Sequence, residues 1–473
     1  MTTTTRPGGA VGDLVVVPSI SFPVSELRKV AAVQSYEERM LFLLLLLAEP
    51  AMRIVYVTSE AIDPATIDYY LRFLPDPDDA RRRLALVDLG EPSIGSLSEK
   101  LLAHPVGLGR LRAAVASLPG GAGMLPFNVT RAEQDLAAAL SLPLYGPRPD
   151  LVWLGSKSGS RQVAMEAGVA VLPGAEDVFA MAELAKAVAG LRERRPDAPA
   201  VVAKLNNGFA GQGNAIIELD GLPDPLSGSD LTASATTFCA LEESWRSFEA
   251  KMQDEGAIVE VLVASEGLRS PSVQLQISPD GEVEVLSTHD QILGGPGNQV
   301  YLGCRFPARA EYRLAIQADA CKVARVLAAR GVTGVFGIDF LVDGDPNAGY
   351  QVILSEINLR MGGTTHPFWM ARLAAGGTYD QASGELRVPG GGARCYVATD
   401  NLKSERLVGS RPADIIERVD RAGLAYDPST ATGATLHLLG ALPAAGKMGV
   451  TCIAPTPGEA DDLYQRTVDL LYR

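Results

Sequence analysis

Ser355-Glu356-Ile357-Asn358-Leu359-Arg360 is the stretch that decides how this chain folds and what chemistry it can do. Side chains alternate along a strand, so Glu356 and Asn358 are expected on one face. Gly337-Ile338-Asp339-Phe340 lies shortly before it, on what we predict to be the neighbouring strand. Asp339, Glu356 and Asn358 then converge as three hard oxygen ligands, the set that Mg²⁺ held against nucleotide phosphates requires. The two segments therefore predict a metal and phosphate site.

The residues that follow strengthen this interpretation. Arg360 lies two positions further along the same face, where it can meet a transferring phosphoryl group or a developing oxyanion. The loop 362–367, GGTTHP, has glycines that let the backbone approach a ligand and hydroxyls that can bind it. His366 has two open interpretations: it orients substrate or acts as a base, or it is a structural histidine that caps the Pro367 turn. Without these neighbours, a Glu and an Asn on one strand face would be interpreted as solvent-facing.

Two lysines supply positive charge for an anionic ligand. Lys204 lies in the strand-like run 201–205, VVAKL, and precedes the glycine-rich stretch 206–213, NNGFAGQG. Backbone N–H groups of such a loop can cover phosphates, although an ordinary hairpin is the alternative. Lys157 follows Leu154-Gly155-Ser156 at the start of a predicted helix. A cation at a helix start is unfavourable for the helix dipole, so we expect an anion to compensate Lys157; an exposed lysine is the other interpretation.

Composition limits the classes of function. The chain has 473 residues and a formal net charge of -14, which disfavours a general attraction to nucleic acid or anionic lipid. The five cysteines are scattered without CxxC spacing, so neither a disulfide framework nor a zinc site is indicated. The apolar run 40–48, MLFLLLLLA, is too short to cross a bilayer and predicts a buried helix. The first residues lack the apolar core of a secretory signal, so we expect a cytoplasmic protein.

Hydrophobic periodicity predicts an α/β chain with an α+β catalytic part. Short apolar runs alternate with helical stretches and predict a parallel sheet; these runs are 14–17, 54–57, 84–87 and 151–153. The first α/β unit is expected from about 14 to 150, where the Pro-rich stretch 143–150 ends it. Runs with period-two alternation follow and predict antiparallel pairing; these are 257–263, 272–278, 283–287, 337–342 and 351–357. A Gly-rich stretch at 376–392 marks a further boundary, after which a smaller α/β piece is expected.

This order of motifs resembles the ATP-grasp superfamily from about residue 151 to 375, and it is most similar to the pheganomycin-type peptide ligases over nearly the whole chain. The resemblance implies an ATP-grasp fold with an N-terminal parallel α/β pre-ATP-grasp domain and a small C-terminal domain. The expected divisions are a flexible tail at 1–13, the pre-ATP-grasp domain at 14–150, the ATP-grasp domain at 151–375 and the C-terminal domain at 376–473.

The same resemblance assigns site residues. Lys157 and Lys204 are expected to contact ATP phosphates beneath a lid from Gly208 through Gly211 to Gly213. Glu260, with the backbone of Val261 and Val263, falls where the family places its adenine and ribose hinge; a paired carboxylate on an edge strand is the other interpretation of Glu260.

Further assignments concern the metal and the substrates. Asp339, Glu356 and Asn358 match the metal ligands, and Arg360 matches the arginine that steadies the acyl phosphate. Arg305 matches a basic residue that faces the γ-phosphate, and a surface arginine is its alternative. Arg269 and Gln274 are expected to line the cleft, where many relatives carry His and Glu and this sequence has Ser272 and Gln274.

The activity that the resemblance implies is an ATP-dependent carboxylate-amine ligation through an acyl phosphate, with Mg²⁺ or Mn²⁺ as the metal. The expected donor is a small guanidino acid, the acceptor is the N-terminus of a peptide or another amine, and the setting is antibiotic biosynthesis. Ligases of this fold are commonly dimers, so a homodimer is implied. No nucleic acid or membrane partner is expected.

Two other functions are compatible with part of this pattern. A biotin-carboxylase-like enzyme would carry Glu directly before its His-Pro pair, whereas Thr365 precedes His366 here. Ala445-Gly446-Lys447-Met448 resembles a biotin attachment site only superficially. A non-catalytic nucleotide-binding protein would be expected to lose a metal ligand, and Asp339, Glu356 and Asn358 are all present.

Overall fold

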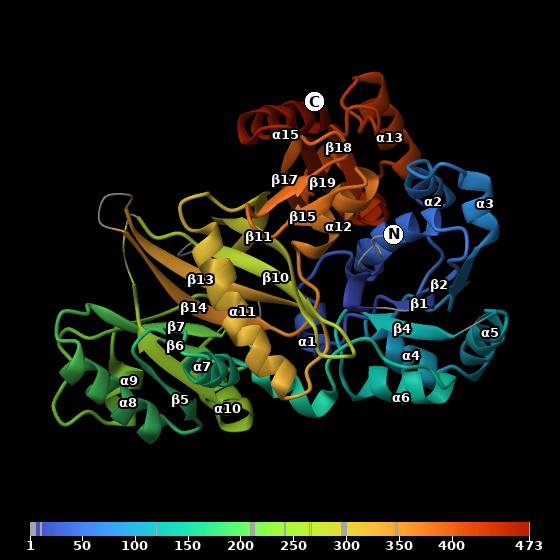
Figure 1. Cartoon of the computed structure of the whole chain (residues 1–473). Coiled ribbons are helices and arrows are strands. Elements are labelled where there is room, and N and C mark those ends of the chain that lie inside the picture. The colour runs from blue at the N-terminus through green and yellow to red at the C-terminus, as the bar shows by residue number, and fades with distance from the viewer. Residues whose placement is uncertain are drawn as a thin grey trace.

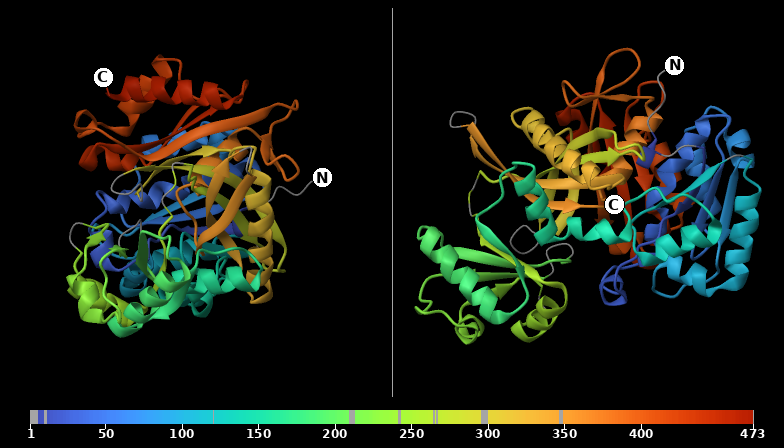
Figure 2. Two further views of the ribbon diagram at one scale, coloured as in Figure 1. Left: turned by 90° about the vertical axis from the view of Figure 1, so that its left-hand side faces the viewer. Right: turned by 60° about the horizontal axis from the view of Figure 1, so that its bottom comes forward.

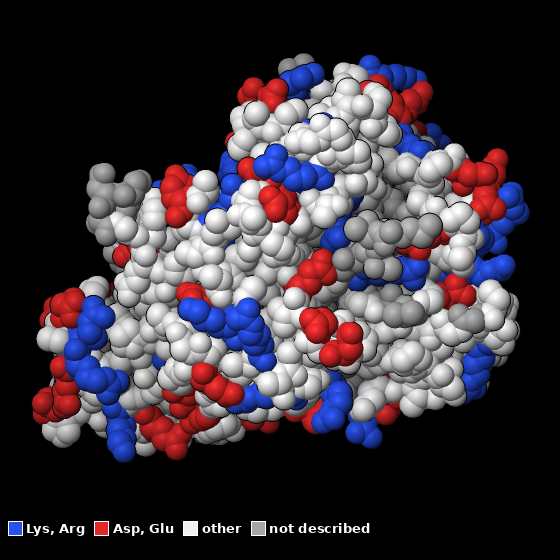
Figure 3. Space-filling model, in the orientation of Figure 1, with Lys and Arg blue, Asp and Glu red and all other residues white. Residues whose placement is uncertain are grey.

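The computed structural model describes residues 6–9, 12–119, 121–208, 213–240, 243–263, 265, 267–294, 300–345 and 349–472. These residues form three β-sheets with helices packed around them (Figure 1). Acidic and basic side chains are interspersed over the face in Figure 3. Within the described chain, no helix is both long and apolar enough to span a bilayer.

The N-terminal sheet is parallel, as predicted, in the order β3-β2-β1-β4. Leu14 and Val16 pack on one face of β1 and Val15 and Val17 on the other, and all four are fully buried, as is usual for a parallel sheet covered on both sides. Its strands are β1 (Asp13–Val17), β2 (Ile54–Thr58), β3 (Leu84–Asp88) and β4 (Ala122–Pro126). Its helices are η1 (Pro7–Gly9), α1 (Val24–Leu27), η2 (Val33–Ala48), α2 (Pro64–Leu71), α3 (Pro77–Arg82), α4 (Leu97–Ala103), α5 (Pro105–Ala116) and α6 (Arg131–Leu140).

Two details of this part differ from the prediction. The predicted strand 151–153 lies inside the 3₁₀ helix η3 (Pro149–Gly155), and the fourth strand is β4 instead. A run of three apolar residues after a proline satisfies the pattern of either element, so periodicity could not separate them. The apolar run at 40–48 is helical, as predicted, but it belongs to the 3₁₀ helix η2, in which Met40 through Leu47 are buried.

The second sheet is antiparallel in the order β5-β9-β6-β7-β8 and has a hydrophobic core of its own. It includes β9, which was predicted to belong to the following strand system; β9 pairs instead with β5 and β6, so it is not an edge strand. The strands are β5 (Gly174–Val178), β6 (Ala200–Leu205), β7 (Asn214–Glu218), β8 (Thr236–Phe238) and β9 (Ala257–Val261). The associated helices are α7 (Lys157–Glu166), α8 (Met181–Arg194), α9 (Gly228–Ala233) and α10 (Trp245–Glu255).

The central sheet is antiparallel and extends through the C-terminal part of the chain, because β12 pairs with β17. Its strands are β10 (Pro271–Ile277), β11 (Val283–Gly294), β12 (Val300–Phe306), β13 (Gly334–Asp345), β14 (Gly349–Asn358), β15 (Thr378–Asp380), β16 (Glu385–Arg387), β17 (Ala393–Lys403), β18 (Gly433–His437) and β19 (Lys447–Ala454). Its helices are α11 (Arg313–Ala329), α12 (Thr365–Ala374), η5 (Glu405–Leu407), α13 (Pro412–Arg421), η6 (Leu439–Ala441), α14 (Leu442–Ala445) and α15 (Pro457–Tyr472).

The first and last parts of the chain lie side by side. Helix η2 packs against η6 and α12, and α2 packs against α13. The views in Figure 2 show the blue N-terminal unit next to the red C-terminal strands, with the green second sheet set apart as a separate lobe. One hydrophobic core runs from the N-terminal sheet into the central sheet and the C-terminal segment. The domain limits at 13, 150 and 375 stay a prediction. At the last of them, the segment that follows shares a sheet with the segment before it, so the sheet itself marks no boundary there.

Candidate active site

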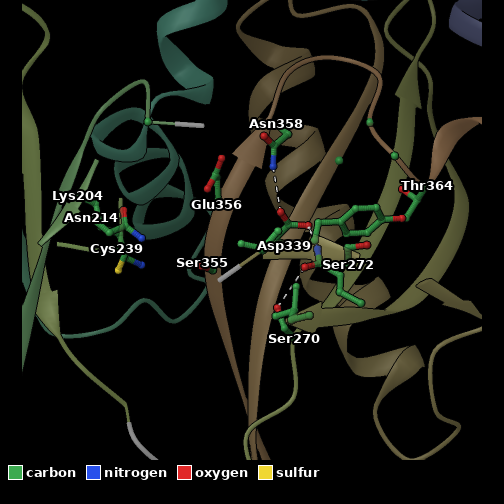
Figure 4. Close-up of a pocket in the computed structure, with 18 of the residues that line it drawn as sticks. Lys204, Asn214, Cys239, Ser270, Ser272, Asp339, Ser355, Glu356, Asn358 and Thr364 are labelled. Atoms are coloured by element: carbon green, nitrogen blue, oxygen red, sulfur yellow. Dashed lines mark hydrogen bonds between the residues drawn. The ribbon is translucent and has the colours of Figure 1, made fainter. Parts of the chain in front are cut away.

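The prediction that the two strands with the candidate metal ligands are neighbours is confirmed. Strands β13 and β14 pair in antiparallel fashion, with Asp339 opposite Glu356 and Gly337 opposite Asn358. Because Gly337 has no side chain, the Asn358 amide can reach across to Asp339, and its Nδ2 donates to Asp339 Oδ2 at 3.0 Å. Figure 4 shows this hydrogen bond between the two adjacent strands. Local alternation and strand pairing thus bring the three predicted metal ligands together.

Asp339 lies in a buried and electrostatically crowded position. Its other carboxylate oxygen accepts a hydrogen bond from Gln291 Nε2 of β11 at 2.8 Å. Burial and the neighbouring charge of Glu356 together raise the pKa of Asp339 to about 7, against the opposing effects of Arg360 and Lys157. Two carboxylates in such a place are costly unless a cation is near.

Glu356 is compensated by a lysine from a distant part of the sequence. Lys157 opens helix α7, where Ser156 caps the helix by accepting from the backbone N–H of Gly159. Lys157 Nζ donates to Glu356 Oε2 at 2.8 Å, and its side chain is nearly buried. Burial would raise the pKa of Glu356, but the charge and hydrogen bond of Lys157 outweigh it, and the pKa is lowered. The anion expected to compensate Lys157 is therefore supplied by the protein in this structure.

A second ion-pair network lies on the other sheet. Lys204 Nζ of β6 donates to Glu260 Oε1 of β9 at 2.6 Å. Glu260 Oε2 accepts from the guanidinium of Arg161 at 3.1 Å, and Arg161 also pairs with Glu176. The Glu260 side chain is 4% exposed, so a buried carboxylate between two cations holds Lys204 in place.

The two sheets face each other across one cleft of about 1080 Å³. Figure 4 shows Lys204, Asn214 and Cys239 on one side and Asp339, Glu356 and Asn358 on the other. The predicted nucleotide residues that line this cleft are Lys157, Lys204, Gly208, Glu260, Val261, Val263, Arg269 and Gln274, and Arg360 lines it with the three metal candidates. Burial lowers the pKa of Arg360, and the carboxylates of Glu356 and Asp339 act in the opposite direction.

The structure describes the predicted adenine hinge and both ends of the predicted glycine-rich lid. Val261 and Val263 line the cleft, but the Val261 N–H already donates to the carbonyl of Pro173 at 3.0 Å. A base edge would therefore need other backbone groups of this segment. Gly208 lines the cleft, whereas Gly211 lies outside the described residues. Gly213 has a φ of +86° and its carbonyl accepts from Leu205, so it closes the turn before β7.

Two buried polar atoms beside the metal candidates lack a partner within the described structure. They are Ser272 Oγ and Gln274 Oε1, both on β10 and both lining the cleft. Ser272 lies opposite Asp339 in the ladder, and Gln274 donates to Thr364 Oγ1 through its amide nitrogen. Buried polar groups normally have partners, so these acceptors fit a site that receives a polar ligand.

The donor set also bears on the metal. The described residues contain no group of three or more His, Cys, Asp and Glu side chains able to hold a metal ion. Asp339, Glu356 and Asn358 provide two carboxylates and one amide, which are hard oxygen donors suited to Mg²⁺ or Mn²⁺. Such a set is compatible with a metal whose coordination is completed by phosphate oxygens and water.

Arg305 and His366 were predicted to be catalytic, and the structure does not bring them to this cluster. Arg305 is half exposed on β12 and pairs with Asp461 of α15 at 2.8 Å. Alternation on β12 directs its side chain outward, which matches the alternative of a surface arginine. His366 is buried in α12, where Nε2 is 2.9 Å from the Tyr70 hydroxyl and the ring stacks on His437. It packs between the N- and C-terminal parts, as a structural histidine does.

Sequence reasoning missed several residues. Arg161 lies four residues after Lys157 on the same helix face, and this spacing was a usable signal that Arg161 is directed toward the same region as Lys157. Gln291 and the cleft-lining side chains Phe22, Tyr36, Arg39, Asp400 and Lys447 carried no local signal, because they reach the cleft from other parts of the fold.

In this structure, lysines face a pair of carboxylates across a cleft between two antiparallel sheets. This arrangement is typical of an ATP-grasp fold. A family described as "IQCH-like, ATP-grasp" matches residues 229–381, and one described as "PGM1 C-terminal domain" matches residues 414–467. The L-propargylglycine--L-glutamate ligase of Streptantibioticus cattleyicolor is 33% identical over 466 residues, which cover 97% of this chain and 93% of that protein. The chain belongs to the ATP-grasp superfamily, among its ligases that form C–N bonds.

Solved structures agree with the fold. Biotin carboxylase from Campylobacter jejuni, in complex with β-γ-ATP, has a TM-score of 0.58 at 15% identity, covering 97% of this chain and 90% of that one. An N5-carboxyaminoimidazole ribonucleotide synthetase in complex with ADP has a TM-score of 0.55 at 14% identity, covering 99% and 98%. The predicted fold class is therefore confirmed. The 33%-identical relative is a ligase and matches nearly the whole chain. It therefore favours the ligase function over the carboxylase alternative and over the non-catalytic one.

Proposed function

We propose that this ligase activates the carboxylate of an amino acid as an acyl phosphate and joins it to the amino group of a second amino acid or a short peptide. The substrates in the name of the 33%-identical relative, L-propargylglycine and L-glutamate, support an amino acid on each side of the new bond. The earlier expectation of a guanidino acid, a peptide N-terminus and antibiotic biosynthesis stays a prediction. So do the cytoplasmic location and the homodimer.

The observation that carries the proposal is the opposition of charges across one cleft. Lys204 and Lys157 each reach a carboxylate in this structure, Glu260 and Glu356 respectively. We assign both lysines to the phosphates of ATP, which would take over part of these ion pairs. Asp339, Glu356 and Asn358 would hold Mg²⁺ or Mn²⁺, which supplies charge neutralisation between carboxylates and phosphates when bound.

The chemistry follows from the poor leaving group of a carboxylate. An oxygen of the donor carboxylate attacks the γ-phosphorus of ATP, the bond to the bridging oxygen breaks, and ADP leaves. The amine nitrogen then attacks the acyl carbon, the bond to phosphate breaks, and the nitrogen loses a proton. Arg360, beside Glu356 and Asp339 in the same cleft, would stabilise the oxyanion of this second step. Thr365 stands where a carboxylate base would be needed in the carboxylase alternative.

The test is incubation of the full chain with ATP, MgCl₂ and amino acids in pairs, beginning with L-glutamate and L-propargylglycine. We expect release of ADP and phosphate that needs both substrates, and a product with the summed mass of the two less one water. ADP release that does not depend on the amine substrate would contradict the proposed function. So would a lack of ADP release with every pair of amino acids and with short peptides.

A further inference from the structure

The cleft continues beyond Arg360 into a recess where three parts of the chain meet. Its walls come from η2 of the N-terminal unit, the loop at 362–365 and strands β17 and β19 of the C-terminal segment. Its half-buried charged side chains are Arg39, Asp400 and Lys447, with the rings of Tyr36 and Phe127 beside them, and the exposed Lys403 of β17 also lines the cleft. We call the space lined by Arg39, Asp400, Lys447, Tyr36 and Phe127 the Arg39 recess. No residue of it belongs to the nucleotide or metal set described above.

Arg39 is held by aromatic rings and not by an ion pair. Its guanidinium carbon lies 4.2 Å from the ring centre of Phe127 and 4.6 Å from that of Tyr36. None of the carboxylates in the described chain forms an ion pair with Arg39, although Asp400 lines the same recess. Contact with rings uses none of the N–H groups of a guanidinium as conventional hydrogen-bond donors to oxygen, so they remain able to bind a ligand. The charge of Asp400 acts on Arg39 without an ion pair between them, so the hydrogen-bonding capacity of this largely desolvated cation is left for a further anion.

Lys447 adds a second positive charge next to it. Its Nζ donates to the Tyr36 hydroxyl and lies 5.1 Å from the centre of the Tyr36 ring. Burial lowers the pKa of Lys447, and Arg39 lowers it further, whereas the nearby Asp400 raises it. Among the described residues, the recess thus places two half-buried cations around a common space with one carboxylate, Asp400, that forms an ion pair with neither. This arrangement is complementary to an amino acid that carries both a carboxylate and an amino group.

We propose that the Arg39 recess binds the free carboxylate of an amino-acid substrate, the carboxylate that is not activated, through Arg39 and Lys447, with Asp400 receiving the amino group next to it. This inference rests on the proposed function, because it places a spectator carboxylate beside the reacting one. The recess adjoins Gly362 and Gly363, which line the same cleft as Arg360. A spectator carboxylate of this kind is present on an acceptor amino acid and on a donor activated at its side chain, and the test separates these two sources.

The test compares each amino acid with its α-carboxamide. The probes are L-glutamate against L-isoglutamine and L-propargylglycine against its amide, each assayed for kcat/KM in the wild type and in Arg39→Gln. For one of the two pairs we expect the wild type to prefer the carboxylate by roughly 10- to 100-fold, the range for a charge-assisted hydrogen bond. Arg39→Gln should reduce this preference toward unity and leave the KM for ATP unchanged, and Arg39→Lys should restore part of it. The linkage in the product, determined by tandem mass spectrometry, shows whether the amino acid that responds is the donor or the acceptor.

Arg72→Gln is the matched control. Arg72 also lies over two rings, those of Tyr69 at 4.2 Å and Phe73 at 5.4 Å, but it pairs with Asp420 outside the cleft. This variant should keep the carboxylate preference. A preference that survives in Arg39→Gln for both pairs, or a KM for ATP that rises in this variant, would overturn the proposal.

Failure of the proposed function is distinguishable from failure of the recess. If no pair supports ADP release, the substrates proposed above are wrong, and the same four compounds are then compared by the shift in Tm that they cause. A larger shift with an acid than with its amide, lost in Arg39→Gln, supports the recess. Equal shifts in the wild type overturn it. If ADP is released and the acid is not preferred, the ligase stands and the recess falls.

Discussion

Lys157, at the start of α7, donates a 2.8 Å hydrogen bond to Glu356 at the end of β14, although 199 positions separate them in the sequence. This contact joins the helix that follows the N-terminal unit to the strand that carries two of the proposed metal ligands. It also explains how a lysine can open a helix, because a carboxylate compensates the unfavourable interaction with the helix dipole.

Replacing Glu356 by Gln should lower ADP release at least about 100-fold, since it removes an anionic metal ligand while keeping the side-chain shape. Initial rates with saturating substrates measure this, and a thermal melt checks that the fold persists. Glu385→Gln is the matched control, because Glu385 pairs with Arg313 and Arg387 away from the cleft. Equal rates in wild type and Glu356→Gln would refute the assignment of Glu356.

Chelation should stop the reaction and added Mg²⁺ or Mn²⁺ should restore it. The expectation follows from Asp339, Glu356 and Asn358, which offer hard oxygen donors and need phosphates to complete a coordination shell. A titration of ADP release against metal concentration measures the requirement, and Asp339→Asn should shift the midpoint to higher metal. Full activity in excess chelator would contradict a metal at these residues.

Lys204→Ala should chiefly weaken nucleotide binding, by about 10-fold or more, because a charged hydrogen-bond donor to phosphate is lost. The affinity for ADP, measured by calorimetry, tests this. Glu260 keeps its pairing with Arg161 in that variant, so we expect the second sheet to stay folded. Lys186→Ala, at an exposed position of α8, is the control. An unaltered affinity in Lys204→Ala would count against the placement of the phosphates beside Lys204.

Acid should destabilise the protein through its buried histidines. His366 and His437 stack with ring centres 4.2 Å apart; burial lowers the pKa of His437 to about 3 and that of His366 well below its usual value. The unfolded chain takes up these protons from about pH 6.5 downward while the folded protein does not, so the free energy of unfolding falls as the pH falls. The slope is at most about 1.4 kcal/mol per pH unit for each histidine.

Denaturant unfolding between pH 8 and 5 measures this dependence. His437→Gln should show a shallower slope than the wild type, and His366→Gln should leave the pH profile of kcat unshifted because His366 packs against Tyr70 and does not line the main cleft. Parallel slopes for wild type and His437→Gln, or a displaced kcat profile in His366→Gln, would contradict this account.

The sequence by itself determined the local half of the site. Alternation along a strand is set by covalent geometry, so Glu356 and Asn358 had to share a face, and the pattern of glycines and apolar runs was sufficient to place Asp339 on the adjoining strand. Tertiary structure decided the rest. The pairing of Lys157 with Glu356, the removal of Arg305 and His366 from the cleft, and the meeting of Arg39 with Asp400 and Lys447 depend on how separate units pack. Packing of this kind is fixed by buried surface summed over the whole molecule, and no short stretch of sequence records it.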